Sequence, residues 1–192
     1  MPTDLREKPH RLVNSQVRYS VKQTYLHRQN LTIHVEFSSE GTPIFRYRLE
    51  AIKNRASNNP RTVCAVMQNP SYASIEIADK SVQVLERVVF EKELAEFNGV
   101  ERLIVVNQFA FIQTKHFVGT DDQIGERNDD AIARAVDESE IVLIAWGKDN
   151  GFMQRQKRIL EIVRAKEGKT LLQTSRHPSR VIYDGFIQQF RT

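Results

Sequence analysis

TVCAVM, the stretch at residues 62–67, decides the fold of this chain of 192 residues. It is short, rich in β-branched residues and almost continuously apolar, which is typical of a strand buried on both faces of a parallel sheet. Three later stretches have the same character: RLIVVN at 102–107, EIVLIAW at 140–146 and TLLQT at 170–174. We therefore expect four central strands joined by long connections.

Amphipathic stretches lie between these strands. Apolar residues at helical spacing predict helices over 79–96, 128–138 and 153–167, and Asn128 is a suitable cap for the second helix. Strand–helix alternation of this kind predicts a parallel sheet with helices on both faces. The expected fold is α/β, a three-layer αβα sandwich around a central, mainly parallel four-stranded sheet.

The first 60 residues follow a different pattern. LTIHVEF at 31–37 alternates apolar and polar residues, a turn signal follows, and residues 44–52 alternate again. This pattern predicts a β-hairpin packed on the edge of the core. A polar linker comes next, so we divide the chain into an N-terminal extension with the hairpin (1–61) and a main domain (62–192).

Composition restricts the cofactors and the location that we expect. Cys64 is the only cysteine, which excludes an internal disulfide, an iron–sulfur cluster and a thiolate zinc site. No apolar run approaches the roughly 20 residues of a membrane span, and the N-terminus MPTDLREKPH lacks the apolar region of a signal peptide. We expect a cytoplasmic protein with no metal, no cofactor and no membrane association.

Charge is unevenly distributed along the chain, whose net charge is +4. Residues 1–61 carry 11 Lys or Arg against 5 Asp or Glu, and residues 151–192 carry 9 against 3. Residues 62–150 carry 8 against 16. Basic ends suit a polyanionic partner, but a solvated surface explains them equally well. Charge alone therefore only permits nucleic acid as a partner.

Polar residues follow three of the four predicted strands. QNPSY at 68–72 comes after the first strand, Asn107 ends the second and QFAF at 108–111 follows it, and SRHPSR at 175–180 comes after the fourth. The carboxyl ends of parallel strands meet at one edge of a sheet, where ligands of such folds bind. We therefore expect the three loops to form one cleft.

These loops carry a resemblance to a known superfamily. LLQTSRHPSRVIYDGFIQQF at 171–190 resembles the C-terminal motif of uracil-DNA glycosylases, in which a strand runs into His-Pro-Ser and an aromatic-rich stretch. Strands that end in Gln68-Asn69-Pro70, in Asn107 and in Trp146-Gly147 follow the order of that superfamily. The resemblance spans about residues 62–190. It is strongest to a family of uncharacterised bacterial and phage domains with Asn-Pro-Ser, Val-Asn-x-Phe-Ala, Ala-Trp-Gly and Arg-His-Pro motifs.

The resemblance implies roles for three residues. Such enzymes extrude a nucleotide into a pocket, and cleavage leaves negative charge on the pyrimidine O2 and positive charge on the sugar. His177 would donate a hydrogen bond to O2, a contact whose removal typically costs on the order of 10²–10³ in rate. Asn69 would hold the attacking water, and because an amide is a poor base the mechanism would depend on positioning. Asn107 would read the base, although its amide suits uracil and cytosine equally.

Departures from the superfamily pattern bear on the substrate. Ser71 stands where uracil-selective enzymes have a Tyr that excludes substituents on C5, and Tyr72 comes one place later. We therefore expect a pocket that accepts 5-substituted pyrimidines, such as the modified bases of phage DNA. Met67 replaces the usual Gly before the first motif. Arg180-Val181 replaces the usual Pro-Leu, which leaves Val181 as a shorter intercalating wedge.

The candidate residues fall into three groups. The catalytic pair is Asn69 and His177. We expect the base to be bound by Gln68, Ser71, Tyr72, Asn107 and Phe109. We expect DNA to be contacted by Lys148, Arg176, Ser179, Arg180 and Val181. Each residue also has an ordinary structural explanation, because Asn-Pro and His-Pro are common in turns, aromatic side chains fill cores and surface cations are solvated.

The sequence thus predicts a monofunctional DNA glycosylase that releases a 5-modified pyrimidine and leaves an abasic site. We expect it to act on DNA as a monomer, with a role in defence against phages. No lysine lies in the three motifs, so Schiff-base lyase chemistry is not indicated. Three alternatives stay open: uracil or mismatch repair, a non-catalytic nucleic-acid-binding module of the same fold, and hydrolysis of free nucleosides.

Overall fold

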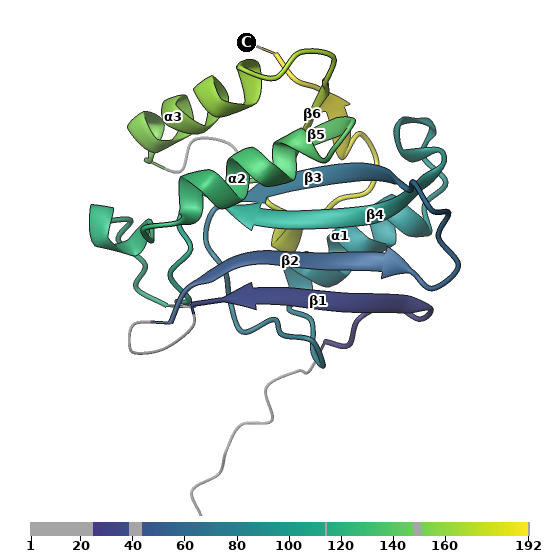
Figure 1. Ribbon diagram of the computed structural model, residues 1–192, viewed down its shortest axis with the longest axis horizontal. Coiled ribbons are helices and arrows are strands. Elements are labelled where there is room, and N and C mark those ends of the chain that lie inside the picture. Colours follow the sequence, from purple (N-terminus) through teal and green to yellow (C-terminus); the bar gives the residue numbers. More distant parts are fainter. Residues whose placement is uncertain (1–24, 39–43, 114, 148–150, 192) are drawn as a thin grey trace, which may run out of the picture.

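The computed structural model describes residues 25–38, 44–113, 115–147 and 151–191, and it has an α/β architecture with helices on both faces of a mixed sheet (Figure 1). The strands are β1 (Leu31–Phe37), β2 (Arg46–Lys53), β3 (Arg61–Met67), β4 (Val100–Asn107), β5 (Ile141–Ile144), β6 (Thr170–Thr174) and β7 (Ile187–Gln189). The helices are α1 (Lys80–Phe90), α2 (Asn128–Asp137) and α3 (Met153–Arg164), with short 3-10 turns η1 (Ala95–Phe97), η2 (Asp121–Gln123) and η3 (Pro178–Arg180). The strand order is β1-β2-β4-β3-β5-β6-β7.

The four strands predicted from apolar runs form the centre of the sheet. β4, β3, β5 and β6 are neighbours in that order and are mutually parallel. Residues 62–67 of β3 are all buried, because β3 is central and helices cover both of its faces. The four strand positions are confirmed, and so are the three helices. The first helix, expected to reach residue 96, ends at Phe90.

The expected number of strands is wrong, because the described residues form a seven-stranded sheet. β1 and β2 form the predicted hairpin, and β2 also pairs antiparallel with β4, so the hairpin extends the sheet at this edge. Leu49 and Ala51 of β2 are fully buried there. At the other edge, β7 pairs antiparallel with β6. Gln188 and Gln189 of β7 are exposed, so this strand has no apolar pattern to predict it.

Two apolar cores lie on opposite faces of the sheet. On one face, Val82, Leu85 and Val88 of α1 pack against residues such as Val63 of β3. On the other face, α2 and α3 pack against the alternate side chains of the same strands. Cys64 lies in this second core, where burial raises the pKa of its thiol to about 12. The protein therefore has three layers, as the alternation of strands and helices predicts.

The beginnings of α1 and α2 each connect a helix to the carboxyl ends of the strands. Asp79 caps α1, because its Oδ1 accepts a hydrogen bond from the backbone N–H of Val82 at 2.9 Å. Asn128 was expected to cap α2, but the structure places it as the first residue of this helix. Its Nδ2 donates to the carbonyls of Asn107 and Gln108, both at 3.0 Å, and this joins α2 to the end of β4.

Ion pairs attach the hairpin to the α2 face. The guanidinium of Arg48 on β2 donates to both carboxylate oxygens of Glu138, at 2.9 and 2.6 Å. Arg102 of β4 bonds both Glu50 and Glu138. Such a bidentate, partly buried network fixes geometry better than isolated surface pairs do. No helix in the described ranges has both the length and the apolar character needed to cross a bilayer.

Candidate active site

A cavity of about 250 Å³ lies where β3 ends, at the edge of the sheet formed by the carboxyl ends of the parallel strands. This volume suits one ring-sized group better than a whole nucleotide. Four residues predicted from the sequence line it, namely Asn69, Ser71, Tyr72 and His177. The other described residues that line it are Met67, Asp79, Lys80, Ser81 and Gln113. Loops after β3 and β6 therefore meet at one site, together with the beginning of α1.

Asn69 is held by its amide nitrogen. Nδ2 donates to the carbonyl oxygen of Gln113 at 2.6 Å and to that of Pro70 at 3.3 Å. The amide orientation follows from these contacts, because a carbonyl can only accept. Oδ1 receives no hydrogen bond from a described residue, so it is the atom that can accept one from a bound water or ligand.

His177 has a tautomer fixed by its own loop. Its Nδ1 accepts the backbone N–H of Ser179 at 3.3 Å and lies 2.9 Å from the Ser179 hydroxyl. A backbone N–H can only donate, so Nδ1 carries no proton and the proton of the neutral ring is on Nε2. Burial lowers the pKa of His177; Asp79 opposes this shift and Arg180 adds to it. The side chain is thus a neutral imidazole at pH 7, with Nε2–H as its free donor.

Gly147, after β5, is required for the placement of this histidine. Its φ is +84°, and a Cβ built on it would lie 3.0 Å from the backbone nitrogen of His177. The strand end at Trp146-Gly147 therefore supports His177 by close backbone approach. The Trp-Gly motif acts through packing, since Trp146 is buried in the core on the α2 face.

Asp79 is a site residue that the sequence analysis missed. It is only 6% exposed, and it carries the only carboxylate among the described residues that line the cavity. From the sequence alone, Asp79 indicates only the beginning of a helix, because Asp is a common N-cap residue. Nothing in the sequence indicates that the capped end of α1 lies beside Asn69 and His177.

Asn107 lies behind the cavity rather than on its surface. It is 1% exposed, and in β-sheet register it is the partner of Met67, which lines the cavity. Its Oδ1 is 3.4 Å from Nη2 of Arg46, and its Nδ2 has no hydrogen-bond partner among the described residues. A buried donor without a partner is costly, so this nitrogen is suited to a ligand that reaches the end of β4.

Two further predicted base contacts, Phe109 and Gln68, also do not line the cavity. Phe109 is buried in an aromatic cluster with Phe117 and Phe152, and it lines a different cavity of about 520 Å³. Gln68 contributes its backbone carbonyl, which accepts the N–H of Phe109 at 3.1 Å. In both cases the strand ends just before, β3 at Met67 and β4 at Asn107, so strand alternation no longer predicts where the following side chains point.

The predicted DNA contacts fall into different environments. Arg176 and Arg180 are exposed on either side of His177 in sequence, and Ser179 holds the His177 ring. Val181 is partly buried against the core on the α1 face, so it is not a protruding wedge. Its neighbour Ile182 is 55% exposed instead. Lys148 lies outside the described residues.

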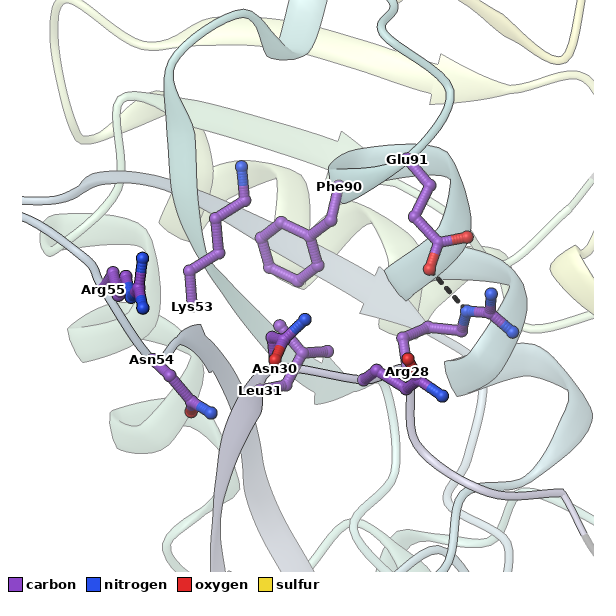
Figure 2. A pocket seen from close by; sticks show the side chains of 9 residues that line it. Arg28, Asn30, Leu31, Lys53, Asn54, Arg55, Phe90 and Glu91 are labelled. Carbon is purple, nitrogen blue, oxygen red and sulfur yellow. Dashed lines mark hydrogen bonds and ion pairs between the residues drawn. The ribbon is translucent and has the colours of Figure 1, made fainter.

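A second cavity, of about 660 Å³, lies at the opposite end of the sheet (Figure 2). It is formed by the end of β2, the beginning of β1 and the end of α1, and it is lined by Arg28, Lys53, Arg55, Phe90 and Glu91, among others. Figure 2 shows Arg28 and Glu91 paired across one side. Nε of Arg28 donates to Oε1 of Glu91 at 2.6 Å. None of the described residues that line this cavity is a histidine, and the end of α1 carries partial negative charge, so the cavity does not match the predicted chemistry.

The described side chains include no group of three or more His, Cys, Asp or Glu residues that could hold a metal ion. The described residues around the 250 Å³ cavity supply several functional groups. These are a neutral imidazole donor, an amide acceptor, a carboxylate and the N–H groups at the beginning of α1.

Comparison with known proteins gives one family and one structure. No curated protein matches the chain. A hetero-hexameric glutamate dehydrogenase from Thermus thermophilus, solved in a Leu-bound form, matches 78% of this chain and 34% of its own at 14% identity and a TM-score of 0.39. The chain spans about a third of that subunit, and a likeness this low carries no argument. The family described as "Protein of unknown function (DUF1643)" matches residues 46–179, from the first residue of β2 to the serine that holds His177. This chain belongs to the DUF1643 family.

Proposed function

We propose that the protein is a monofunctional DNA glycosylase that takes one extruded pyrimidine into the 250 Å³ cavity and hydrolyses its N-glycosidic bond. The observation that carries the proposal is the meeting of Asn69, Ser71, Tyr72 and His177 in that cavity, each from a loop after a parallel strand. The order of the four central strands and the motifs at their ends support assigning the α/β fold to the uracil-DNA-glycosylase type.

The imidazole would stabilise the leaving base. When the bond between C1′ and the ring nitrogen breaks, its electron pair passes to the base and negative charge develops on O2. Nε2–H of His177 is a preorganised neutral donor for that oxygen, because Nδ1 is already occupied by Ser179. The beginning of α1, with Lys80 and Ser81 at the cavity, adds partial positive charge.

Asn69 and Asp79 would position and activate the attacking water. Oδ1 of Asn69 can accept a hydrogen bond from the attacking water, whose oxygen forms the new bond to C1′. Asp79 supplies the charge that the amide of Asn69 lacks, because a carboxylate stabilises the cationic sugar and can take the proton that the water loses. The mechanism then combines positioning by the amide with electrostatic stabilisation by the carboxylate.

Ser71 supports a preference for 5-substituted pyrimidines. Ser71 lines the cavity, and in the sequence it stands where uracil-selective enzymes have the Tyr that excludes substituents on C5. Modified phage bases carry their substituents on C5, so we propose that class as substrate, with a role in phage defence. Plain uracil and mismatched thymine are the competing substrates, and a single assay compares them.

The test is a panel of duplex and single-stranded oligonucleotides. They contain uracil, mismatched thymine, 5-hydroxymethyluracil or glucosylated 5-hydroxymethylcytosine, and abasic sites are detected by alkaline cleavage. We expect release of at least one 5-modified base, and a loss of about 10²–10³ in rate for His177→Ala with DNA binding retained.

The matched control is His34→Ala, which replaces an exposed histidine of β1 and should leave the rate unchanged. Release of uracil alone would return the assignment to repair. If the intact protein binds DNA but releases no base from the whole panel, the binding-module alternative is correct and the enzymatic proposal is wrong.

A further inference from the structure

Arg46, the first residue of β2, is a fully buried arginine from the hairpin. Its Nη1 donates to the carbonyl of Ala73 at 3.1 Å, two residues after the cavity residue Ser71. Its Nη2 lies 3.4 Å from Oδ1 of Asn107, and its Nε has no partner among the described residues. None of the described carboxylates forms an ion pair with it. A charge buried in this way is expensive and needs an explanation.

A β-bulge directs Arg46 to the face of the sheet on which the cavity opens. Glu36 of β1 pairs with Arg48, but Phe37 pairs with Arg46, so β2 has one extra residue there. Tyr47, the extra residue, packs with Ala131 of α2 on the opposite face. Bulges re-aim side chains in this way next to functional sites.

The guanidinium keeps its charge at neutral pH despite its burial. Burial lowers the pKa of Arg46 to about 10, and the negative charge of Asp79 opposes the shift. Asp79 lines the cavity, so the charge of Arg46 is felt there at low dielectric.

We propose that Arg46 is a positioning residue that orients the Asn107 amide toward the base and places a positive charge behind the leaving group. This proposal rests on the proposed function. Nη2 of Arg46 donates to Oδ1 of Asn107, so Nδ2 of Asn107 is left as a free donor. This nitrogen would donate to an acceptor atom of the pyrimidine. Negative charge spreads over the pyrimidine ring as the glycosidic bond breaks, and the guanidinium stabilises it. The hairpin, which lies outside the superfamily resemblance, would then complete the site.

The experiment compares bases that differ in how well they accept negative charge. Single-turnover release is measured for a 5-fluoro, an unsubstituted and a 5-methyl base, built on whichever ring, uracil or cytosine, the intact protein releases. We expect Arg46→Met to slow the 5-methyl and unsubstituted bases by about 10²-fold, the effect of one preorganised donor. The 5-fluoro base, a better leaving group, should be slowed least. Arg46→Lys keeps the positive charge but lacks the planar guanidinium that donates to two acceptors at once. It should therefore recover only part of the rate.

Arg48→Met is the matched control, because Arg48 is a buried arginine of the same strand that bonds Glu138 on the other face. It should affect all three bases equally. All variants are assayed below their melting temperatures, and Arg46→Gln replaces Arg46→Met if the latter does not fold. An equal loss for all three bases, or no loss, overturns the role of Arg46. Absence of release by the intact protein is a different result, since it rejects the proposed function and the role of Arg46 with it.

Discussion

At the scale of single residues, substitutions of Asp79 can separate its proposed chemical role from its role as the N-cap of α1. Asp79→Asn keeps a good N-cap for α1 but removes the charge from the cavity. We expect base release to fall by about 10²–10⁴, the range for a lost general base. The free energy of unfolding, measured in urea, should fall less than in Asp79→Ala, because Asn keeps a side-chain oxygen that can accept the N–H of Val82.

Asp79→Ala is the companion variant. It loses the charge and the hydrogen bond to Val82, so it should show the same kinetic defect and an additional loss of about 1 kcal/mol in unfolding free energy. If Asp79→Asn retains the full rate, Asp79 is a cap only, and Asn69 and the sugar cation are sufficient.

The role of Gly147 can be tested in a similar way, with Gly168 as the glycine for comparison. Gly147→Ala should cost about 1–2 kcal/mol of stability for the left-handed backbone and should also slow base release, because the new Cβ displaces His177. Gly168→Ala is the control: its φ is +72°, but nothing lies within 4 Å of a Cβ built there. Thermal unfolding and single-turnover rates are measured together. Equal kinetic effects of the two variants would contradict the role assigned to Gly147.

At the scale of elements, a buried ion pair attaches the segment before β1 to α1. Nδ1 of His27 lies 2.5 Å from Oε1 of Glu86, and its Nε2 is 2.9 Å from the carbonyl of Ser74. Burial alone would lower the pKa of His27, but the hydrogen bond and charge of Glu86 outweigh it, so the pKa is raised. The pair thus favours the imidazolium in the folded state.

Stability should therefore depend on pH with a defined sign. A raised pKa means that the stabilisation from His27 is fully present below its unfolded pKa of about 6.5 and is lost as pH rises through the folded pKa. The loss in unfolding free energy caused by His27→Gln should be largest near pH 5.5 and should shrink at alkaline pH. Urea titrations across this range test it, with His34→Gln as control. A loss that grows with pH would show that His27 is neutral in the fold.

Whether a strand could be predicted from the sequence depends on how it is buried. β3 and its parallel neighbours are covered on both faces, so their apolar runs are visible without any knowledge of the sheet. β7 is a short edge strand with exposed glutamines, and it forms because the β6 edge lies beside it. The pairing of β2 with β4 also could not be predicted, since alternation indicates a hairpin but not the strand that it joins.

At the scale of the whole molecule, the distribution of charge predicts how DNA binding depends on salt. Arg176 and Arg180 are exposed beside the cavity. If both contact phosphates, replacing them with Ala should reduce the slope of log Kd against log salt by about 0.9 for each contact. Arg164→Ala, at the exposed end of α3, is the control and should leave the slope unchanged. Fluorescence anisotropy at several salt concentrations measures the slopes.

The candidate site was predictable only in part. Asn69, Ser71, Tyr72 and His177 follow directly from strand ends, and the rule that such ends converge brings them to one cavity. The position of Asp79 depends on the packing of α1, and that of Arg46 depends on the bulge at Tyr47. Neither feature leaves a sequence signal. The placement of Phe109 failed because the chain turns after β4, and turn geometry rather than periodicity decides which cavity it enters.

The antiparallel seam between β2 and β4 has a consequence for any shortened version of the protein. A fragment that begins at residue 62 would retain all the loops that line the 250 Å³ cavity, but the edge of its β4 would expose unpaired backbone donors and acceptors to solvent. Such an exposed rim recruits strands from other molecules and promotes aggregation. The hairpin therefore covers the β4 edge and leaves β1, with exposed polar residues such as Thr32 and His34, as the edge strand. A minimal fragment of the protein should keep it.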